Sequence, residues 1–174
     1  MARMPYHVQV FLYRPDADGT IRYAFFERSD YAGAWQGVCG GGEEGESIVQ
    51  TAVRESCEEA GLTDPGPVYH LNSISWMRPM YYERFITVWG KELVVMPMYY
   101  FGMPFSGDIV LSDEHTQYRW ATADECLELT YFNEQKTAIW ELEQRILRGE
   151  VEREPPAWMQ VEHNIESYIK FLGS

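Results

Sequence analysis

Residues 40–62 constrain this chain more than any other segment, because they join three adjacent glycines, an acidic turn and a helical pattern that ends at a glycine. Glu55, Glu58 and Glu59 are three and four residues apart, so we expect their side chains to share one face of a helix. Like charges at that spacing repel by roughly 0.2–0.5 kcal/mol per pair, and a cation would remove this repulsion. Carboxylate oxygens beside a glycine-lined opening favour Mg²⁺, with Mn²⁺ as the alternative. The segment therefore predicts a metal-dependent phosphate site.

The same segment predicts a helix over residues 47–60 that Gly61 ends. Its apolar residues recur with helical spacing on the side opposite the carboxylates. Ser56 lies at the edge of this apolar stripe, where we expect its hydroxyl to bond a carbonyl one turn earlier. The predicted buried stripe consists of Val49, Val53, Cys57 and Ala60.

The rest of the chain alternates strand-like and helical patterns, an order that favours an α+β layered domain. We expect Thr122 or Asp124 to cap a short helix, and Asn133 to cap a longer helix that Gly149 ends. Strands are predicted over residues 6–14, 21–28, 35–38, 68–76, 86–89, 94–101 and 118–121, helices up to residues 129 and 148, and a final amphipathic helix over residues 158–172.

Composition excludes a disordered chain, since 45% of the residues are apolar and 15% are aromatic. With 174 residues, the chain has the length of one domain with a substantial core. Its 14 basic and 27 acidic residues give a net charge of −13, which disfavours a nucleic-acid polymer as the partner. The same charge repels a small polyphosphate unless metal ions and local arginines reverse the field at the site.

The cysteines and the start of the chain indicate a cytoplasmic protein. Cys39, Cys57 and Cys126 form no CxxC pair, a pattern that suggests a reducing compartment. Residues 1–14 lack the basic-then-apolar plan of a signal peptide. The longest apolar stretch, residues 93–105, is too short to cross a membrane and contains two prolines. We therefore expect no membrane association.

The glycine-to-helix segment resembles the Nudix box: Gly, five residues, Glu, seven residues, Arg-Glu, and then Glu-Glu-x-Gly followed by an aliphatic residue. The one departure is Ser56, where the family usually has an aliphatic residue. The resemblance implies the Nudix fold, a mixed β-sheet sandwiched between α-helices, over residues 1–150. Residues 151–174 are expected to be a helical extension that packs on the same domain. The matching positions are Gly40, Glu46, Arg54, Glu55, Glu58, Glu59, Gly61 and Leu62.

The resemblance also implies roles for the charged residues of the box. In the family, carboxylates at the positions of Glu55 and Glu59 bind a divalent metal, and the one at Glu58 often joins them. Such a metal neutralises polyphosphate charge and turns a bound water into a competent nucleophile. Glu58 and Glu59 are therefore also catalytic candidates. Arg54 and Glu46 match positions whose salt bridge steadies the helix against the preceding loop.

Residues 111–120, LSDEHTQYRW, resemble a segment of the Nudix enzymes that hydrolyse dihydroneopterin triphosphate and dATP. This resemblance implies that Glu114 is a further metal ligand or the general base. His115 beside it could act as an acid or base, but we favour a histidine at the surface or one that only supports a ligand residue. In the same enzymes basic residues occur at the positions of Arg28 and Arg3, which implies phosphate contacts at both.

Residues 76–85, WMRPMYYERF, mix aromatic side chains with Arg78 and Arg84. This loop could stack a base or pterin ring while Arg78 holds a phosphate. It could equally be a sheet edge or a dimer contact, so a monomer and a homodimer both stay open. His7, His70 and His163 show no metal-ligand grouping.

Gly40, Gly42 and Gly45 also match the G-x-G-x-x-G pattern of dinucleotide-binding folds. We disfavour that alternative, because glutamates fill the loop where a pyrophosphate would bind and only one βαβ-like unit is visible. A Walker-type loop is absent, since no Gly-Lys-Ser/Thr follows the glycines.

These patterns together predict a metal-dependent pyrophosphohydrolase that splits a nucleoside or pterin triphosphate into the monophosphate and pyrophosphate. Arg28 would steady the charge of the departing group. An ADP-sugar or another nucleoside-diphosphate derivative is the alternative substrate. A module that only binds nucleotide is the alternative from another class, although such modules tend to lose carboxylates of the box, and none is lost here.

Overall fold

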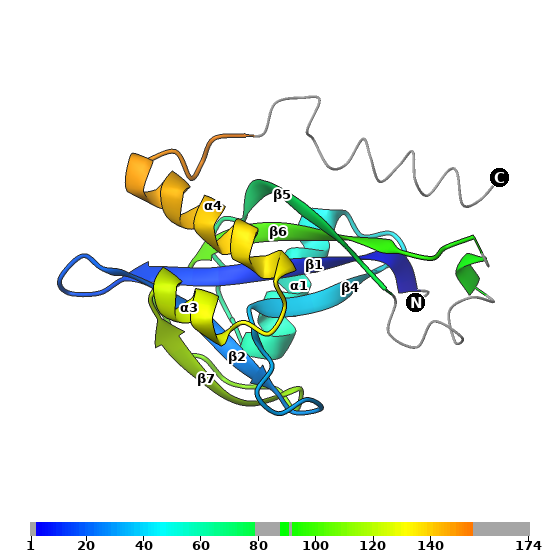
Figure 1. Cartoon of the computed structure of the whole chain (residues 1–174), viewed down its shortest axis with the longest axis horizontal. Coiled ribbons are helices and arrows are strands. Elements are labelled where there is room, and N and C mark those ends of the chain that lie inside the picture. Colours follow the sequence, from blue (N-terminus) through cyan, green and yellow to red (C-terminus); the bar gives the residue numbers. More distant parts are fainter. Residues whose placement is uncertain (1–2, 79–87, 91, 155–174) are drawn as a thin grey trace.

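The structure, a computed structural model, describes residues 3–78, 88–90 and 92–154. In this part of the chain a mixed β-sheet lies between helices on its two faces (Figure 1). The elements are, in chain order, β1 (Arg3–Pro15), β2 (Ile21–Arg28), β3 (Trp35–Gln36), β4 (Val38–Glu43), α1 (Ile48–Ala60), β5 (Tyr69–Met77), β6 (Met96–Pro104), β7 (His115–Ala121), α3 (Ala123–Leu129) and α4 (Glu134–Arg148).

The described strands form one sheet in the order β3-β2-β1-β6-β5, with β4 added beside β1 and β7 beside β2. β1 runs parallel to β6, whereas the other pairs are antiparallel. Because β6 takes one edge of β1, β4 and β2 share the other: β4 pairs with residues 3–10 and β2 with residues 13–15. The chain over residues 35–43 therefore crosses from β2 to β1, and the site described below lies at this crossing.

Side chains alternate along β1 and build two separate cores. Val8 and Val10 pack on one face of the sheet with Ala52 of α1. Phe11 packs on the other face with Ile139 of α4, and α3 contributes to the same core. Figure 1 accordingly shows α3 and α4 on one side of the sheet and α1 on the other. This arrangement confirms the predicted α+β class, with a mixed sheet sandwiched between helices.

The predicted strands are present except in two places. β4 runs through Gly40, Gly41 and Gly42, which we had expected to follow a short strand as a loop, because these glycines pair with β1. The strand expected over residues 86–89 is wrong at Val88 and Trp89, which are helical, and residues 86–87 lie outside the described residues. The predicted C-terminal helix also lies outside them, so its packing on the domain stays a prediction.

The predicted buried stripe of α1 is confirmed only in part. Ala60 is fully buried, whereas Val49, Val53 and Cys57 are half-buried, and Val49 and Cys57 pack against the core. The small residues and two carboxylates of the helix lie against the glycine-rich strand β4. Ser56 is fully buried and donates its hydroxyl to Ala52 O at 2.8 Å, as expected. The buried residues of the helix are Ile48, Thr51, Ala52, Glu55, Ser56, Glu59 and Ala60.

The helix ends follow the predicted signals, with one exception. Ser47 caps α1 and Thr122 caps α3, each through a capping box with the residue three positions later. Asn133 precedes α4 but has helical backbone angles and makes no side-chain cap hydrogen bond, so its predicted capping role is wrong. None of the helices in the described part of the chain combines the length and apolar character that membrane crossing requires.

Gly61 and Gly149 provide a matched test of how α1 is fixed. Both end a helix with φ near +66°, so alanine meets a similar left-handed strain of roughly 1–2 kcal/mol at each. Only at Gly61 would the new Cβ lie 2.7 Å from Val110 Cβ and 2.9 Å from Val110 O, whereas nothing lies within 4 Å at Gly149. We expect Gly61→Ala to reduce the free energy of unfolding, measured in urea, by more than Gly149→Ala does. Equal losses would show that the contact with Val110 is unimportant for stability.

Candidate active site

Two glutamates of α1, Glu55 and Glu59, are buried where residues 35–43 cross from β2 to β1. The carboxylate of Glu55 lies directly against the backbone of Gly40, so that a Cβ at position 40 would overlap it. A Cβ at Gly42 would likewise overlap the ring of Tyr6. These two glycines therefore allow the strand to approach α1 closely, and their function is packing rather than a flexible phosphate loop.

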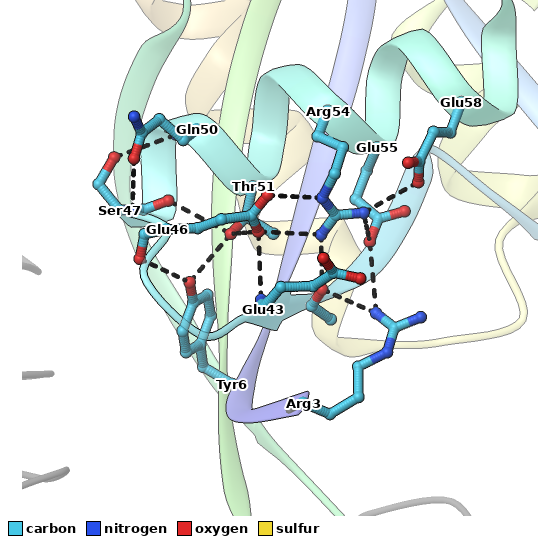
Figure 2. Close-up of polar contacts among 11 residues, drawn as sticks. Arg3, Tyr6, Glu43, Glu46, Ser47, Gln50, Thr51, Arg54, Glu55 and Glu58 are labelled. Atoms are coloured by element: carbon cyan, nitrogen blue, oxygen red, sulfur yellow. Dashed lines mark hydrogen bonds and ion pairs between the residues drawn. The ribbon is translucent and has the colours of Figure 1, made fainter. Parts of the chain in front are cut away.

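Arg54 binds the acidic turn, the strand and the helix together (Figure 2). Its Nε donates to Glu46 Oε1 at 2.7 Å, which is the ion pair expected from the sequence, and its Nη2 donates to Gly41 O at 2.9 Å. Its Nη1 donates to Glu55 Oε1 at 2.8 Å and to Glu58 Oε2 at 2.9 Å, contacts that we did not expect. One guanidinium thus compensates three carboxylates.

Glu46 is fixed from several directions. Besides Arg54, the hydroxyl of Thr51 donates to Glu46 Oε2 at 2.9 Å, and the backbone N–H of Glu43 donates to the same oxygen at 3.1 Å. Figure 2 shows Tyr6 under this turn, with its hydroxyl 2.9 Å from that of Thr51. The turn between β4 and α1 is therefore closed onto the helix.

Glu59 has its own partners. Its Oε2 accepts from the backbone N–H of Cys39 at 3.2 Å and lies 2.8 Å from Nε2 of His115. His115 is buried at the start of β7, so the expectation of a surface histidine is wrong, whereas the alternative of a histidine that supports a ligand residue agrees with this contact. Sequence alone could not join residues 56 positions apart.

Burial makes both carboxylates easy to protonate. It raises the pKa of Glu55 to about 7, although the contacts with Arg54 act in the opposite direction. Burial also raises the pKa of Glu59, against the lowering effect of His115. Two buried carboxylates near each other, whose pKa values stay raised despite their cationic and imidazole partners, form a place where further positive charge is favourable.

The other two candidate glutamates are exposed, unlike this buried pair. The side chain of Glu58 is 59% exposed, but its Oε2 and Glu55 Oε1 both accept from Arg54 Nη1, at 2.9 and 2.8 Å. Glu58 therefore lies beside Glu55, as their spacing of three residues on one helix face predicts, while Glu59 is buried one turn along. Glu114 is exposed, but its charge contributes to the raised pKa of Glu59, which places it near the site.

The predicted phosphate-binding arginines lie in different surroundings. Arg28 pairs in register with His115 but is held by Asp30, through bonds of 2.7 and 2.6 Å to its two carboxylate oxygens. Arg3 Nη1 donates to Gly41 O at 2.9 Å and lies 3.7 Å from Glu55 Oε1. Arg78 is exposed directly after β5 and, within the described residues, makes no hydrogen bond or ion pair with these groups. Of the three predicted phosphate-binding arginines, Arg3 and Arg28 thus lie near the buried carboxylates.

The buried pair has the donor chemistry of a site for Mg²⁺ or Mn²⁺, which prefer carboxylate oxygens. Within the described residues, Oε2 of Glu55 and Oε1 of Glu59 accept no hydrogen bond, so each carboxylate keeps an oxygen for a ligand. The same part of the chain contains no converged group of three or more His, Cys, Asp or Glu side chains. Glu55 and Glu59 therefore fit a metal, and further ligands require side chains to turn toward them.

Comparison with known proteins gives a consistent result. The Nudix domain family matches residues 5–141 of this chain. The asymmetrical bis(5'-nucleosyl)-tetraphosphatase of Sus scrofa is 30% identical over 135 residues, which cover 73% of this chain and 82% of that protein. The protein of the same name from Rattus norvegicus is 28% identical over 134 residues, with the same coverage of 73% and 82%.

Solved structures have the same fold. A Listeria monocytogenes protein described as a Nudix hydrolase matches with a TM-score of 0.73 at 28% identity, over 87% of this chain and 100% of that one. The dihydroneopterin triphosphate pyrophosphohydrolase of E. coli matches with a TM-score of 0.65 at 23% identity, over 85% of this chain and 99% of that one. At 23% identity the second likeness concerns the fold alone. The chain therefore belongs to the Nudix family of hydrolases, which act on phosphoric anhydride bonds.

Proposed function

We propose that this protein is a metal-dependent hydrolase that cleaves a small nucleotide polyphosphate, and that a dinucleoside polyphosphate is its substrate class. The observation that carries the proposal is the buried pair Glu55 and Glu59 at the crossing of the strands. Such a pair is costly without a cation, and a hydrolase of phosphoric anhydrides needs a cation at the phosphates.

In this proposal Glu55 and Glu59 hold the metal, and Glu58 or Glu114 turns inward to complete its ligands. The metal, when bound, neutralises phosphate charge and makes water acidic enough to attack phosphorus. Arg54 keeps Glu55 in place, and the Cys39 N–H and His115 keep Glu59 in place. Glu58 and Glu114 are on the solvent side, where a carboxylate can accept a proton from the attacking water.

The arginines supply the remaining positive charge. Arg3 lies beside Glu55, and Arg28 lies near Glu59, so both can meet a phosphate chain that reaches the carboxylates. Arg28 can bind a phosphate only after it releases Asp30. The two hydrogen bonds to the Asp30 carboxylate occupy the edge of the guanidinium that would bind an anion. Arg78, from the end of β5, is proposed to contact a distal part of the substrate.

Two substrate classes have specific support. The curated relatives at 27–30% identity are named asymmetrical bis(5'-nucleosyl)-tetraphosphatases, which favours a dinucleoside polyphosphate. The residues Arg3, Arg28 and Glu114 support a nucleoside or pterin triphosphate through the resemblance described above, and this is the second candidate. Two alternatives remain to be tested: an ADP-sugar as the substrate, and a module that binds a nucleotide without hydrolysing it.

Replacing Glu59 tests the site directly. Glu59→Gln removes a buried charge but keeps the shape of the side chain, so we expect the fold to persist and kcat with Mg²⁺ to fall by orders of magnitude. Glu128→Gln, at an exposed position of α3, is the matched control and should leave kcat unchanged. Near-normal turnover of Glu59→Gln would refute the proposed role.

Metal binding should depend on pH, because carboxylates must be ionised to bind Mg²⁺. The pKa of Glu55 is about 7 in the folded protein, so a proton has to leave before the metal binds at lower pH. We expect a fixed Mg²⁺ concentration to raise Tm more at about pH 8 than at about pH 6. The difference should shrink in Glu55→Gln; an equal Mg²⁺ effect at both pH values in the native protein would contradict this assignment.

A substrate panel with product analysis separates the candidate functions. We expect a dinucleoside tetraphosphate to give the highest kcat/KM and two unequal nucleotide products. Preferential release of pyrophosphate from a triphosphate would support the second candidate, and cleavage of ADP-ribose the third. Nucleotide binding without turnover of any compound would indicate a binding module.

A further inference from the structure

His7 and Arg3 converge over Gly41, and His7 has no role in the function proposed above. A Cβ at Gly41 would lie 3.1 Å from His7 Nε2 and 3.3 Å from Arg3 Nη1. Since position 41 is a glycine, no side chain of that residue separates the two nitrogens. Two nitrogen donors that converge in this way can bind the same ligand atom.

The side chain of His7 faces the side of the sheet that α4 covers, whereas Arg3 also reaches Glu55 of α1. His7 lies opposite Gly41 on β4 and Met98 on β6. Gln9, two residues along the same face of β1, donates to Gln135 Oε1 of α4 at 2.9 Å. His7 and Gln9 are polar residues in a strand that is otherwise mostly apolar and buried, a pattern that is visible in the sequence.

The imidazole of His7 is neutral in the free protein. Burial, together with the charges of Arg3 and Arg28, lowers its pKa to about 4. Its Nδ1 is buried and has no hydrogen-bond partner among the described residues. We assign the proton to Nε2, because that tautomer presents the N–H toward Gly41, where a ligand can accept it.

We propose that His7 Nε2 and Arg3 Nη1 together hold a non-bridging phosphate oxygen of the substrate above Gly41. This role rests on the proposed hydrolase function. Arg3 Nη1 lies 3.7 Å from Glu55 Oε1, so the held phosphate is next to the carboxylates that we assign to the metal. A phosphate suits this place better than a heterocycle, because two arginines lie near His7 in a chain of net charge −13.

Two variants test the contact in opposite ways. His7→Ala removes the donor, and Gly41→Ala keeps the donor but fills the gap with a methyl group. We expect each to raise KM roughly tenfold or more, since a hydrogen bond to a charged group has that effect, while kcat changes little. His7→Gln, whose amide can donate near the position of Nε2, should restore much of the loss. His70→Ala on β5 is the control for loss of a histidine and should leave KM unchanged. The centroid of the His70 ring lies 4.6 Å from that of Phe101.

The inhibition constants of inorganic pyrophosphate and adenosine then identify the ligand group. In His7→Ala we expect inhibition by pyrophosphate to weaken roughly tenfold and inhibition by adenosine to stay unchanged. Weaker inhibition by adenosine alone, or a native KM in Gly41→Ala, would overturn the proposal.

A measurement that needs no turnover separates this proposal from the proposed function. In the native protein with Mg²⁺, titration with pyrophosphate should shift the imidazole nitrogen resonances of His7 in NMR spectra and leave those of His70 in place. If the shift occurs without hydrolysis of any substrate, the proposed function fails and the phosphate contact stands. If hydrolysis occurs and the His7 signals do not move, the contact is wrong.

Discussion

The arrangement of the site depends on the guanidinium of Arg54 lying against carboxylates that are removed from water. Removing one partner of such a buried pair typically costs about 3–5 kcal/mol, because the other charge is left uncompensated. Arg54 also donates to Gly41 O, so the same group fixes strand β4 relative to α1. Even with this partner, the pKa of Glu55 is about 7. The contacts with Arg54 therefore do not offset the cost of burying an ionised Glu55. Binding of a further cation there would be favourable.

The three glycines of β4 serve both faces of the strand, because successive residues of a strand point to opposite sides. Gly40 and Gly42 face α1, where the carboxylate of Glu55 and the ring of Tyr6 occupy the space that side chains would need. Gly41 faces the other side, between Arg3 and His7. A run of glycines that looks like a flexible loop is thus a paired strand, and neighbouring side chains occupy the space on both of its sides. The carboxylate of Glu55 lies on one side, and Arg3 and His7, which we propose to bind phosphate, lie on the other.

Sequence reasoning succeeded where the signal is local. The end of α1 at Gly61 and the α+β class follow from local patterns, whereas the Glu46–Arg54 ion pair was expected from the family resemblance. Local patterns predicted the buried face of α1 only in part, because apolar periodicity contains no information about glycines on another strand that make room for carboxylates. The contact of His115 with Glu59 joins residues from different elements, and their pairing depends on where β7 docks on β2. Local pattern contains no information about such docking.

The charge distribution then limits how a polyphosphate can be recognised. In an acidic chain, the arginines around the site are already engaged: Arg54 by carboxylates and Arg28 by Asp30, while the side chain of Arg3 is 50% exposed. A phosphate can recruit Arg28 only by displacing Asp30, so Asp30 competes with every anionic ligand. Weak anions lose this competition, whereas a chain of several phosphates that also reaches the metal and Arg3 can win it. If the protein acts as proposed, we expect the competition from Asp30 to favour polyphosphates over single phosphates, without any contact to the base.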